Sequence, residues 1–331
     1  MKIVLIGEAA DHAGDLRRGL HGPYEIVALP AEAAGSAGHD ALIGTDDVVV
    51  SLRWSRPDGV IPTFRLLHVP GAGLDAIDMA ALDPQTTIAN VFEHEIPIAE
   101  FVLARLLEWQ IRAAAMQAAF TPSAWPRHYR HRMPHGELHG TTLGIVGYGR
   151  IGQAIAVRAA AFGMRVRAVD DRVTAAGTAP DGIAELAPAA LLPDVVAGCD
   201  AVVLACPLTP STTRLVDASL LDRMPAHAVL VNISRAEIAD EAALYTALRT
   251  GRIGGAILDV WYRYPTSPRE DVAPAQYPFW ELPNAWCTPH SSAWTHQLPR
   301  RRYAVVAENV NRLVSGEPLR NVVRAAHQQG L

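Results

Sequence analysis

Short runs of apolar residues alternate with stretches of helical periodicity along most of the chain. This alternation is typical of parallel α/β domains, in which each buried strand is followed by a helix. The runs fall into two groups, so we expect two sheets. The expected strands are residues 2–7, 24–29, 47–52 and 66–73 in a first unit, and residues 141–149, 164–170, 200–206, 228–234 and 254–260 in a second.

A long stretch between the two groups, residues 96–120, carries apolar residues at helical spacing and has Pro97 near its start. Proline is favoured in the first turn of a helix, so the pattern predicts one continuous helix that joins the two units. The next segment, residues 121–140, is rich in proline, histidine and arginine and predicts a solvated or interface loop. Its histidines are irregularly spaced beside arginines that would repel a cation, so we expect no metal site.

Composition narrows the possible partners and locations. The chain has 331 residues, enough for two domains with separate cores, and its 19% of charged residues is an ordinary globular balance. A net charge of −5 argues against nucleic acid or an anionic membrane as the main partner. The opening apolar run is too short for a signal peptide, and charged residues interrupt the best candidate for a membrane helix. Three scattered cysteines favour a reducing, cytoplasmic location.

Gly147, Gly149 and Gly152 form a G-x-G-x-x-G pattern between an expected strand and an alanine-rich helix. The first glycine allows a tight turn, the second lets a pyrophosphate approach the backbone, and the third packs the helix against the strand. The amides at the start of the helix then hold the negative charge. The pattern in this position predicts a dinucleotide-binding Rossmann domain, and a glycine-rich turn without a ligand is the alternative.

Asp170 ends the next expected strand and indicates which dinucleotide binds. An acid at this point accepts hydrogen bonds from the adenine-ribose hydroxyls and repels a 2′-phosphate. Asp171 strengthens this negative charge, whereas Arg172 opposes it. We therefore predict NAD rather than NADP as the cofactor.

Several further motifs follow one another in a fixed order. They are "VPGAGLDAIDMAAL", "IPIAEFVLARLL", "ELHGTTLGIVGYGRIG", "CPLTPSTTRLV", "LVNISRAEIADEAAL", "GGAILDVW", "CTPHSSAWT" and "AENVNRLVSGEPLRNVV". In this order they make the chain resemble the NAD-dependent D-2-hydroxyacid dehydrogenases, a family that includes phosphoglycerate, formate and phosphite dehydrogenases. The resemblance covers nearly the whole chain.

The resemblance implies an α/β fold of two doubly wound parallel-sheet domains. A flavodoxin-like substrate domain would comprise residues 1–97 and 294–331, and a Rossmann NAD domain would comprise residues 98–293. A small anionic substrate would bind in an active-site cleft between them. Relatives are commonly dimers through the nucleotide domain, so the resemblance also implies a homodimer, with the long helix from Pro97 and the loop after it as the expected contact.

The resemblance also assigns roles to single residues. Arg235 in "NISRAE" matches the arginine that grips the substrate carboxylate with two parallel hydrogen bonds. His290 in "TPHSS" matches the histidine that exchanges a proton with the substrate oxygen. Taken alone, Arg235 would more often form a structural ion pair and His290 would more often pack. Asp259 matches the acid beside the ribose and nicotinamide. The other positions expected to contact NAD are Arg150, Ile151, Cys206, Pro207, Thr212 and Ile233.

The sequence departs from the family pattern at two positions. Ala236 replaces a glycine, which is tolerated if its φ is negative. The second departure concerns the motif D-V-x-x-x-E-P, whose glutamate hydrogen-bonds the catalytic histidine and raises its pKa in relatives. Here the same count from Asp259 reaches Tyr264, followed by Pro265. A tyrosine is neutral at pH 7, so it would orient His290 without favouring the imidazolium by charge.

Three explanations of the tyrosine remain open. Tyr264 is a neutral orienter, and His290 titrates near its unperturbed value. Alternatively, the following loop supplies the carboxylate, from Glu270, Asp271 or Glu281. Or the reaction needs no strong general acid, as when hydride leaves a formate-like or phosphite-like donor; formate dehydrogenases also lack the glutamate.

Fewer residues indicate where the substrate binds. Arg53, after an expected strand, would add positive charge with Arg56 for a second acidic group, and two exposed loop arginines are the alternative. Ala72 and Gly73 lie where relatives offer amides to the substrate carboxylate. His94 matches the position of an asparagine that formate dehydrogenases use against their substrate.

These features together predict an NAD-dependent oxidoreductase that transfers hydride between nicotinamide and a small 2-hydroxy or 2-oxo acid. The positive charge of Arg53 extends this prediction to acids with a second anionic group, such as a carboxylate, phosphate or phosphonate. A formate-type or phosphite-type dehydrogenase is the alternative within the enzyme class. An NAD-sensing binding protein, like the corepressors that share this fold, is the alternative of another class.

Overall fold

The computed structural model describes residues 1–57, 59–267 and 269–326. The chain divides into two compact units. Unit 1 comprises Met1–Glu93 with Thr295–Leu331, and unit 2, His94–Trp294, is inserted between these two segments. Among the described residues, no helix is both long and apolar enough to cross a membrane.

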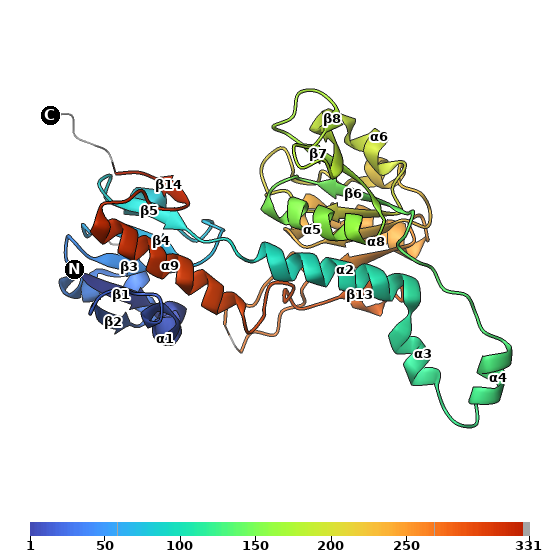
Figure 1. Ribbon diagram of the computed structural model, residues 1–331, viewed down its shortest axis with the longest axis horizontal. Helices are drawn as coiled ribbons and strands as arrows, with labels where there is room; N and C mark the ends of the chain where they lie inside the picture. Colours follow the sequence, from blue (N-terminus) through green and yellow to red (C-terminus); the bar gives the residue numbers. More distant parts are fainter. Residues whose placement is uncertain (58, 268, 327–331) are drawn as a thin grey trace. The chain divides into compact units, whose positions relative to one another are not determined.

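Unit 1 is built on a six-stranded sheet with the order β14-β5-β4-β3-β1-β2. Strands β1 to β5 run parallel, whereas β14 pairs antiparallel with β5. Apolar clusters cover both faces, which is why the central strands are continuous apolar runs. Helices α1 and α9 pack together on one face (Figure 1). The elements are β1 Lys2–Ile6, α1 Ala13–Arg17, β2 Glu25–Leu29, β3 Val48–Val50, β4 Leu66–Val69, β5 Thr87–Asn90, α9 Leu298–Ser315 and β14 Val322–Arg324.

Unit 2 is built on an eight-stranded sheet with the order β13-β12-β11-β10-β6-β7-β9-β8. All neighbouring strands are parallel except β8, which runs antiparallel to β9. The segments that follow β6, β7, β10, β11, β12 and β13 therefore lie along one edge of the sheet. The strands are β6 Thr142–Val146, β7 Arg165–Asp170, β8 Gly177–Thr178, β9 Ala184–Pro188, β10 Ala201–Leu204, β11 Val229–Asn232, β12 Gly255–Leu258 and β13 Ala285–Cys287.

Helices cover both faces of the unit 2 sheet. Helices α2 and α5 pack against each other and share one apolar cluster with the strands, while α6, α7 and α8 contribute to the other. Because both faces are covered, the strands are buried along their length. The helices are α2 Glu95–Ile111, α3 Ala113–Ala119, α4 Trp125–Arg130, α5 Arg150–Ala161, α6 Leu192–Val196, α7 Ala218–Leu221 and α8 Glu241–Arg249.

The expectation of one continuous helix over residues 96–120 is wrong. Helix α2 ends just before Arg112 and α3 begins just after it, because Arg112 adopts the left-handed conformation with a φ of 59°. Its guanidinium carbon lies 4.4 Å from the ring centroid of Trp109 and 5.0 Å from that of Trp286. These cation–π contacts stabilise the break. Neither glycine nor proline marks the position, so helical periodicity could not reveal it.

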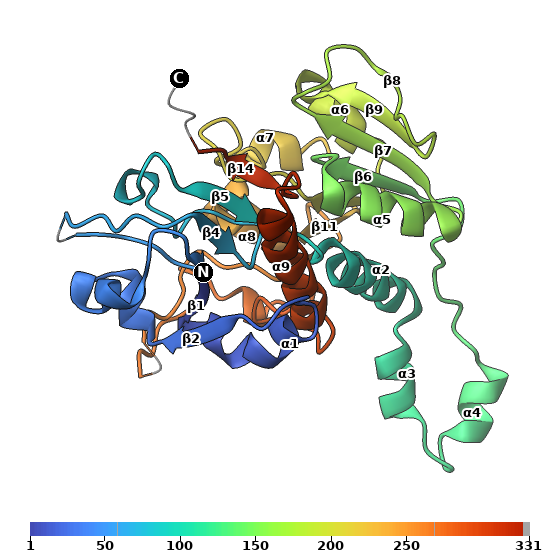
Figure 2. The ribbon, with the colours of Figure 1, turned by 60° about the vertical axis from the view of Figure 1, so that its left-hand side comes forward.

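Residues 113–135 form an arm of unit 2 that carries α3 and α4 and stands away from the sheet of that unit (Figures 1 and 2). Large apolar side chains on this arm are exposed, from 47% for Met116 to 84% for Met133. Aromatic rings follow one another along it, with centroid distances of 5.8 Å from Phe120 to Trp125 and 5.1 Å from Trp125 to Tyr129. The arm therefore carries apolar surface that is left exposed in the single chain.

Candidate active site

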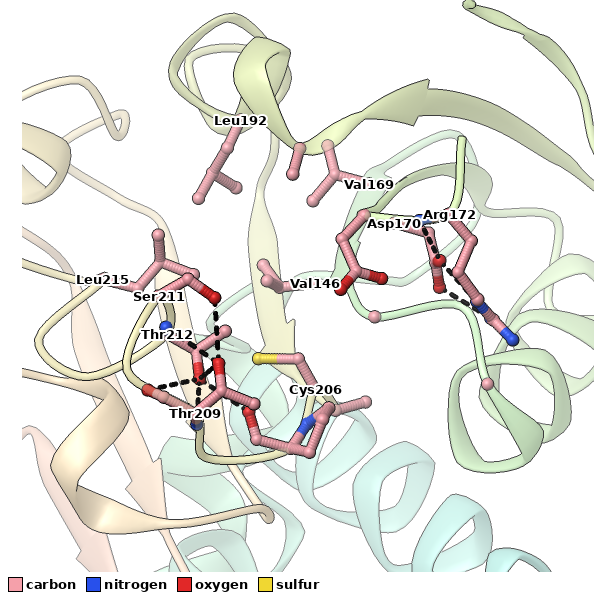
Figure 3. A pocket seen from close by; sticks show the side chains of 16 residues that line it. Val146, Val169, Asp170, Arg172, Leu192, Cys206, Thr209, Ser211, Thr212 and Leu215 are labelled. Carbon is pink, nitrogen blue, oxygen red and sulfur yellow. Dashed lines mark hydrogen bonds and ion pairs between the residues drawn. The ribbon is translucent and has the colours of Figure 1, made fainter. Parts of the chain in front are cut away.

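A pocket of about 490 Å³ opens in unit 2 where β6, β7 and β10 end (Figure 3). Asp170 and Arg172 lie at one end, the hydroxyls of Thr209, Ser211 and Thr212 lie at the other, and the side chain of Cys206 lies between them. The size is that of a small-molecule or cofactor site. The remaining lining residues are Val146, Gly147, Gly149, Val169, Asp171, Ala189, Leu192, Ala205, Pro207 and Leu215.

The glycine-rich turn at the base of this pocket is fitted to a phosphate group. Gly147 has a φ of 97°, and a Cβ there would lie 2.7 Å from the amide nitrogen of Cys206. A Cβ on Gly152 would collide with the carbonyl oxygen of Gly147, so this glycine lets α5 pack against the turn. A Cβ on Gly149 would meet no atom within 4 Å, and Gly149 lines the pocket. The turn thus leaves room for an anion beside the amides that open α5.

The carboxylate of Asp170 is largely engaged by protein donors. It accepts hydrogen bonds from the amide of Tyr148 at 2.8 Å and from the amide, Nε and Nη2 of Arg172 at 3.0, 2.7 and 2.8 Å. Hydrogen bonding to Arg172 holds the pKa of Asp170 well below its usual range, so the carboxylate stays charged. The exposed guanidinium puts a positive charge at the same end of the pocket. Arg172 therefore offsets part of the negative charge on which the prediction of NAD rests.

The opposite end of the pocket is polar and uncharged. The amide of Thr209 donates to Oγ1 of Thr212 at 2.7 Å, and that hydroxyl donates to the carbonyl of Pro207 at 2.7 Å. The hydroxyls of Ser211 and Thr209 lie 2.9 Å apart. Burial raises the pKa of the Cys206 thiol to about 11, so it stays protonated at pH 7.

These walls fit a nicotinamide dinucleotide, which supplies the hydride chemistry when bound. The predicted cofactor residues that line the pocket are Gly147, Gly149, Asp170, Cys206, Pro207 and Thr212. The other predicted cofactor residues lie outside its lining: Arg150, Ile151 and Gly152 in α5, Ile233 after β11, and Asp259 after β12.

Sequence reasoning missed the apolar wall of the pocket. This wall includes Val169, Leu192 and Leu215, none of which was assigned a role from the sequence. Single apolar residues near strand ends look like core positions in a sequence, so nothing in the sequence distinguished them. In the part of the chain that the structure describes, no group of three or more His, Cys, Asp or Glu side chains is arranged to hold a metal ion.

His290 lies on the loop after β13 with a φ of 55°, a conformation that residues with side chains seldom adopt. The carboxylate of Asp259, which is 0% exposed, holds this loop in place. It accepts the hydroxyl of Thr288 at 2.6 Å and the amides of Ser291 and Ser292 at 2.9 Å each. The protein donors on both oxygens of Asp259 thus position His290.

The hydroxyl of Tyr264 lies 2.9 Å from Nδ1 of His290. The same hydroxyl oxygen accepts the backbone amide of Trp261 at 3.1 Å. Trp261 is tied to the histidine loop in turn, because its indole Nε1 donates to the carbonyl of Thr288 at 2.8 Å. This is the contact that a neutral orienter of His290 requires.

The carboxylates of the loop after Tyr264 do not take the place of a partner for His290. Glu270 accepts the amide and the hydroxyl of Thr266 at 2.7 and 2.5 Å. Across the residues that the structure describes, His290 makes no hydrogen bond to Glu270, Asp271 or Glu281. The side chain in contact with Nδ1 is therefore a phenol and not a carboxylate.

Charges around the histidine act in opposite directions on its pKa. Burial lowers the pKa of His290, the charge of Asp259 raises it, and the charge of Arg235 lowers it. Because the net shift is downward, the imidazole is mainly neutral at pH 7. Burial also raises the pKa of Tyr264, so its hydroxyl keeps its proton.

Arg235 follows β11 on a turn that Asn232 fixes. The amide group of Asn232 donates to the carbonyl of Arg235 at 2.9 Å, and its oxygen accepts the amide of Ser234 at 3.1 Å. Ala236, where relatives have glycine, opens the 3₁₀ helix Ala236–Ile238 and is not in the left-handed region. The alanine is therefore compatible with this turn.

The predicted substrate-side residues belong to different units. Arg53 follows β3, and Ala72 and Gly73 follow β4, so all three lie at one edge of the unit 1 sheet. Arg53 and Gly73 are exposed. His94 belongs to unit 2, where it precedes α2 with Nδ1 4.0 Å from the carboxylate of Glu95.

Arg56 is not available to a substrate, contrary to the expectation from the sequence. Its side chain is fully buried, pairs with Asp40 at 3.0 Å and donates to the carbonyl of Ala34 at 2.8 Å. The guanidinium carbon lies 3.9 Å from the ring centroid of Trp54. A buried charge requires such partners, so Arg56 is a structural residue of unit 1.

The part of unit 2 that contains the pocket, Arg235 and His290 matches a known family. The model described as "D-isomer specific 2-hydroxyacid dehydrogenase, NAD binding domain" matches residues 103–292. The chain belongs to this family. The match confirms the resemblance seen in the sequence and identifies unit 2 as the member's NAD-binding domain.

Other members of the D-isomer specific 2-hydroxyacid dehydrogenase family extend the likeness over the chain. Glycerate dehydrogenase of Methylorubrum extorquens is 32% identical over 91% of each chain. D-3-phosphoglycerate dehydrogenase of Methanocaldococcus jannaschii is 33% identical over 78% of this chain and 47% of its own. The chain thus spans about half the length of the phosphoglycerate dehydrogenases that it matches.

Solved structures of the same family confirm the two-sheet α/β fold. A family protein from Aeromonas salmonicida has a TM-score of 0.76 at 26% identity and covers 97% of this chain and 98% of its own. A second, from Xanthobacter autotrophicus in complex with NADPH and MES, has a TM-score of 0.70 at 27% identity, with the same coverage of both chains. The second protein binds NADPH, so family membership alone does not decide between NAD and NADP here.

Proposed function

We propose that this protein is an NAD-dependent dehydrogenase that interconverts a small 2-hydroxy acid and its 2-oxo acid. Arg235 binds the substrate carboxylate together with the amides of Ala72 and Gly73. His290 exchanges a proton with the substrate oxygen. Where the substrate carries a second anionic group, Arg53 binds that group. Family membership and the phosphate-fitted turn support this proposal.

The observation that carries the proposal is the way in which His290 is held. Its left-handed backbone costs free energy, and the buried carboxylate of Asp259 receives three hydrogen bonds from its loop. Strained conformations of this kind persist where function requires a side chain in one position. A histidine that only packed would need neither the strain nor the contact with Tyr264.

The direct test follows NADH oxidation with a panel of 2-oxo acids that includes glyoxylate and phosphonopyruvate. We expect turnover with at least one of them, and Arg235→Lys should lower kcat/KM by about 100-fold because an ammonium cannot make the paired contact. Arg223→Lys, in an exposed ion pair with Asp194, is the matched control and should retain activity.

Other outcomes of this panel favour the alternatives. NAD reduction with formate or phosphite, and none with 2-hydroxy acids, would indicate a formate-type or phosphite-type dehydrogenase. Tight NAD binding with no turnover on any acid would indicate an NAD-sensing binding protein.

We propose NAD as the physiological cofactor because the charged Asp170 lies at the end of the pocket where the adenine ribose is expected. Its pairing with Arg172 brings a guanidinium to the same place, so the discrimination depends on the carboxylate.

Asp170→Ser is expected to raise the ratio of kcat/KM for NADPH to that for NADH by about 100-fold. The change removes the charge that repels a 2′-phosphate and releases Arg172 to bind one. Steady-state kinetics with both cofactors measures the ratio. Asp194→Ser removes an exposed acid on α6 and should leave the ratio unchanged; an equal ratio in both variants would contradict the proposed role of Asp170.

Tyr264 is proposed as a positioning residue for His290. Tyr264→Phe should lower turnover about tenfold because the ring loses its hydrogen bond. Tyr264→Glu should move the alkaline limb of the rate of 2-oxo acid reduction to higher pH, since a carboxylate beside the imidazolium raises its pKa. Initial rates across pH test both, with Tyr245→Phe in α8 as the control; an unchanged pH profile in both Tyr264 variants would refute the role.

We also propose that the protein is a homodimer whose arms, residues 113–135, contact the second copy. The arm exposes several large apolar side chains that a stable partner would cover.

We propose the cytoplasm as the location of the protein. Cys199, Cys206 and Cys287 are free thiols, as is usual in a reducing compartment.

The double variant Phe120→Glu, Trp125→Glu is expected to be monomeric because it puts charges on the apolar face of the arm. Light scattering coupled to size exclusion measures the mass directly. Trp280→Glu changes a tryptophan that is also about half exposed but lies off the arm, and it should remain a dimer. A dimeric double variant, or a monomeric unmodified protein, would exclude the arm as the contact.

A further inference from the structure

The hydroxyl of Tyr264 has two neighbours that together determine where its proton points. The amide of Trp261, 3.1 Å away, can only donate, so the phenolic oxygen accepts there. Nδ1 of His290, 2.9 Å away, is the other neighbour. A phenol is a good donor and a weak acceptor, whereas an unprotonated imidazole nitrogen is a good acceptor. The hydroxyl proton therefore belongs between Oη and Nδ1.

We propose that Tyr264 fixes neutral His290 as the tautomer that carries its proton on Nε2. Nδ1 accepts the hydroxyl of Tyr264, so the ring proton must be on the other nitrogen. A carboxylate in the place of Tyr264 would act in the opposite way, because it can only accept. It would hold the proton on Nδ1 and leave a lone pair on Nε2.

The charged groups nearby do not reverse this assignment. The carboxylate of Asp259 receives its hydrogen bonds from Thr288, Ser291 and Ser292, and it acts on the ring only through its field. Arg235 acts on the ring through its positive charge. Neither group offers an acceptor to Nδ1 in the described structure.

The tautomer decides which ligand atom neutral His290 binds. This consequence rests on the proposed function, in which Nε2 faces the substrate oxygen. With a proton on Nε2, the neutral ring donates to an acceptor, such as the carbonyl oxygen of a 2-oxo acid or the oxygen of an anionic analogue. It has no lone pair on Nε2 with which to accept the proton of a 2-hydroxy acid. The resting site is therefore matched to 2-oxo acids.

The tautomer can be measured without substrate by two-bond ¹H–¹⁵N correlation spectra of the full chain labelled with ¹⁵N-histidine. The chain has 13 histidines, and a His290→Gln spectrum identifies the signals that belong to His290. Above the pKa of the ring, we expect Nδ1 to resonate as an unprotonated nitrogen and Nε2 as a protonated one. Tyr264→Phe should shift both signals toward the average of the two tautomers. In Tyr264→Glu, Nδ1 should resonate as the protonated nitrogen and Nε2 as the unprotonated one.

The matched control is Tyr245→Phe, which removes a hydroxyl from α8 and should leave both shifts as they are. Circular dichroism shows that each variant is folded. A protonated Nδ1 in the neutral unmodified protein, or identical shifts before and after Tyr264→Phe, would overturn the proposal whatever the enzyme proves to catalyse.

Binding gives the second readout and keeps the two proposals apart. Oxamate, an unreactive analogue of a 2-oxo acid, should bind the complex with NADH about twofold more weakly in Tyr264→Phe, because only about half of the neutral rings then carry the donor on Nε2. If the expected tautomer is found but the protein neither binds oxamate nor turns over an oxo acid, the proposed function is refuted and the tautomer proposal stands. If oxamate binds but the other tautomer is found, the tautomer proposal is refuted and the proposed function stands.

Discussion

The hydrogen bonds to the buried carboxylate of Asp259 are the interaction on which the position of His290 depends. A single acid after β12 joins that strand to the loop after β13, so two neighbouring parallel strands fix the loop that carries His290. An ionised carboxylate is stable at 0% exposure because its donors replace water. The same three bonds hold His290 in its left-handed backbone and place a negative charge near its ring.

Two features of the charge pattern make unit 2 less negative, one beside His290 and one in the dinucleotide pocket. A phenol takes the place of a carboxylate beside His290, and a guanidinium covers Asp170 at the far end of the dinucleotide pocket. The geometry of the glycine turn does not depend on either change, because it is set by backbone and packing. Ionisable groups beside the turn therefore affect pH dependence and cofactor choice without altering the shape of the turn.

The sequence predicted the parts of the structure that follow from local pattern. The expected strands of both sheets contain β1 to β4, β6, β7 and β10 to β12, and the glycine turn has the backbone that the motif requires. The short strands β5, β8, β9, β13 and β14 were missed because a few half-apolar residues give no period. Arg56 looked like a ligand for an acid, but its side chain is buried. It pairs with Asp40, which lies 16 residues earlier in the chain, and its guanidinium lies over the ring of Trp54. Such contacts arise from tertiary packing, which a linear pattern does not contain.

Arg112, the single residue between α2 and α3, sets the angle between these two helices. Helix α2 is anchored on α5, whereas α3 extends into the arm, so the two torsions of Arg112 set the direction in which α3 leaves α2. Helix α3 is about 10 Å long at about 1.5 Å per residue, so a rotation of about 10° at Arg112 displaces its far end by about 2 Å. Arg112 directly precedes the arm and does not line the dinucleotide pocket. The apolar surface of the arm and the dinucleotide pocket thus depend on different segments of unit 2.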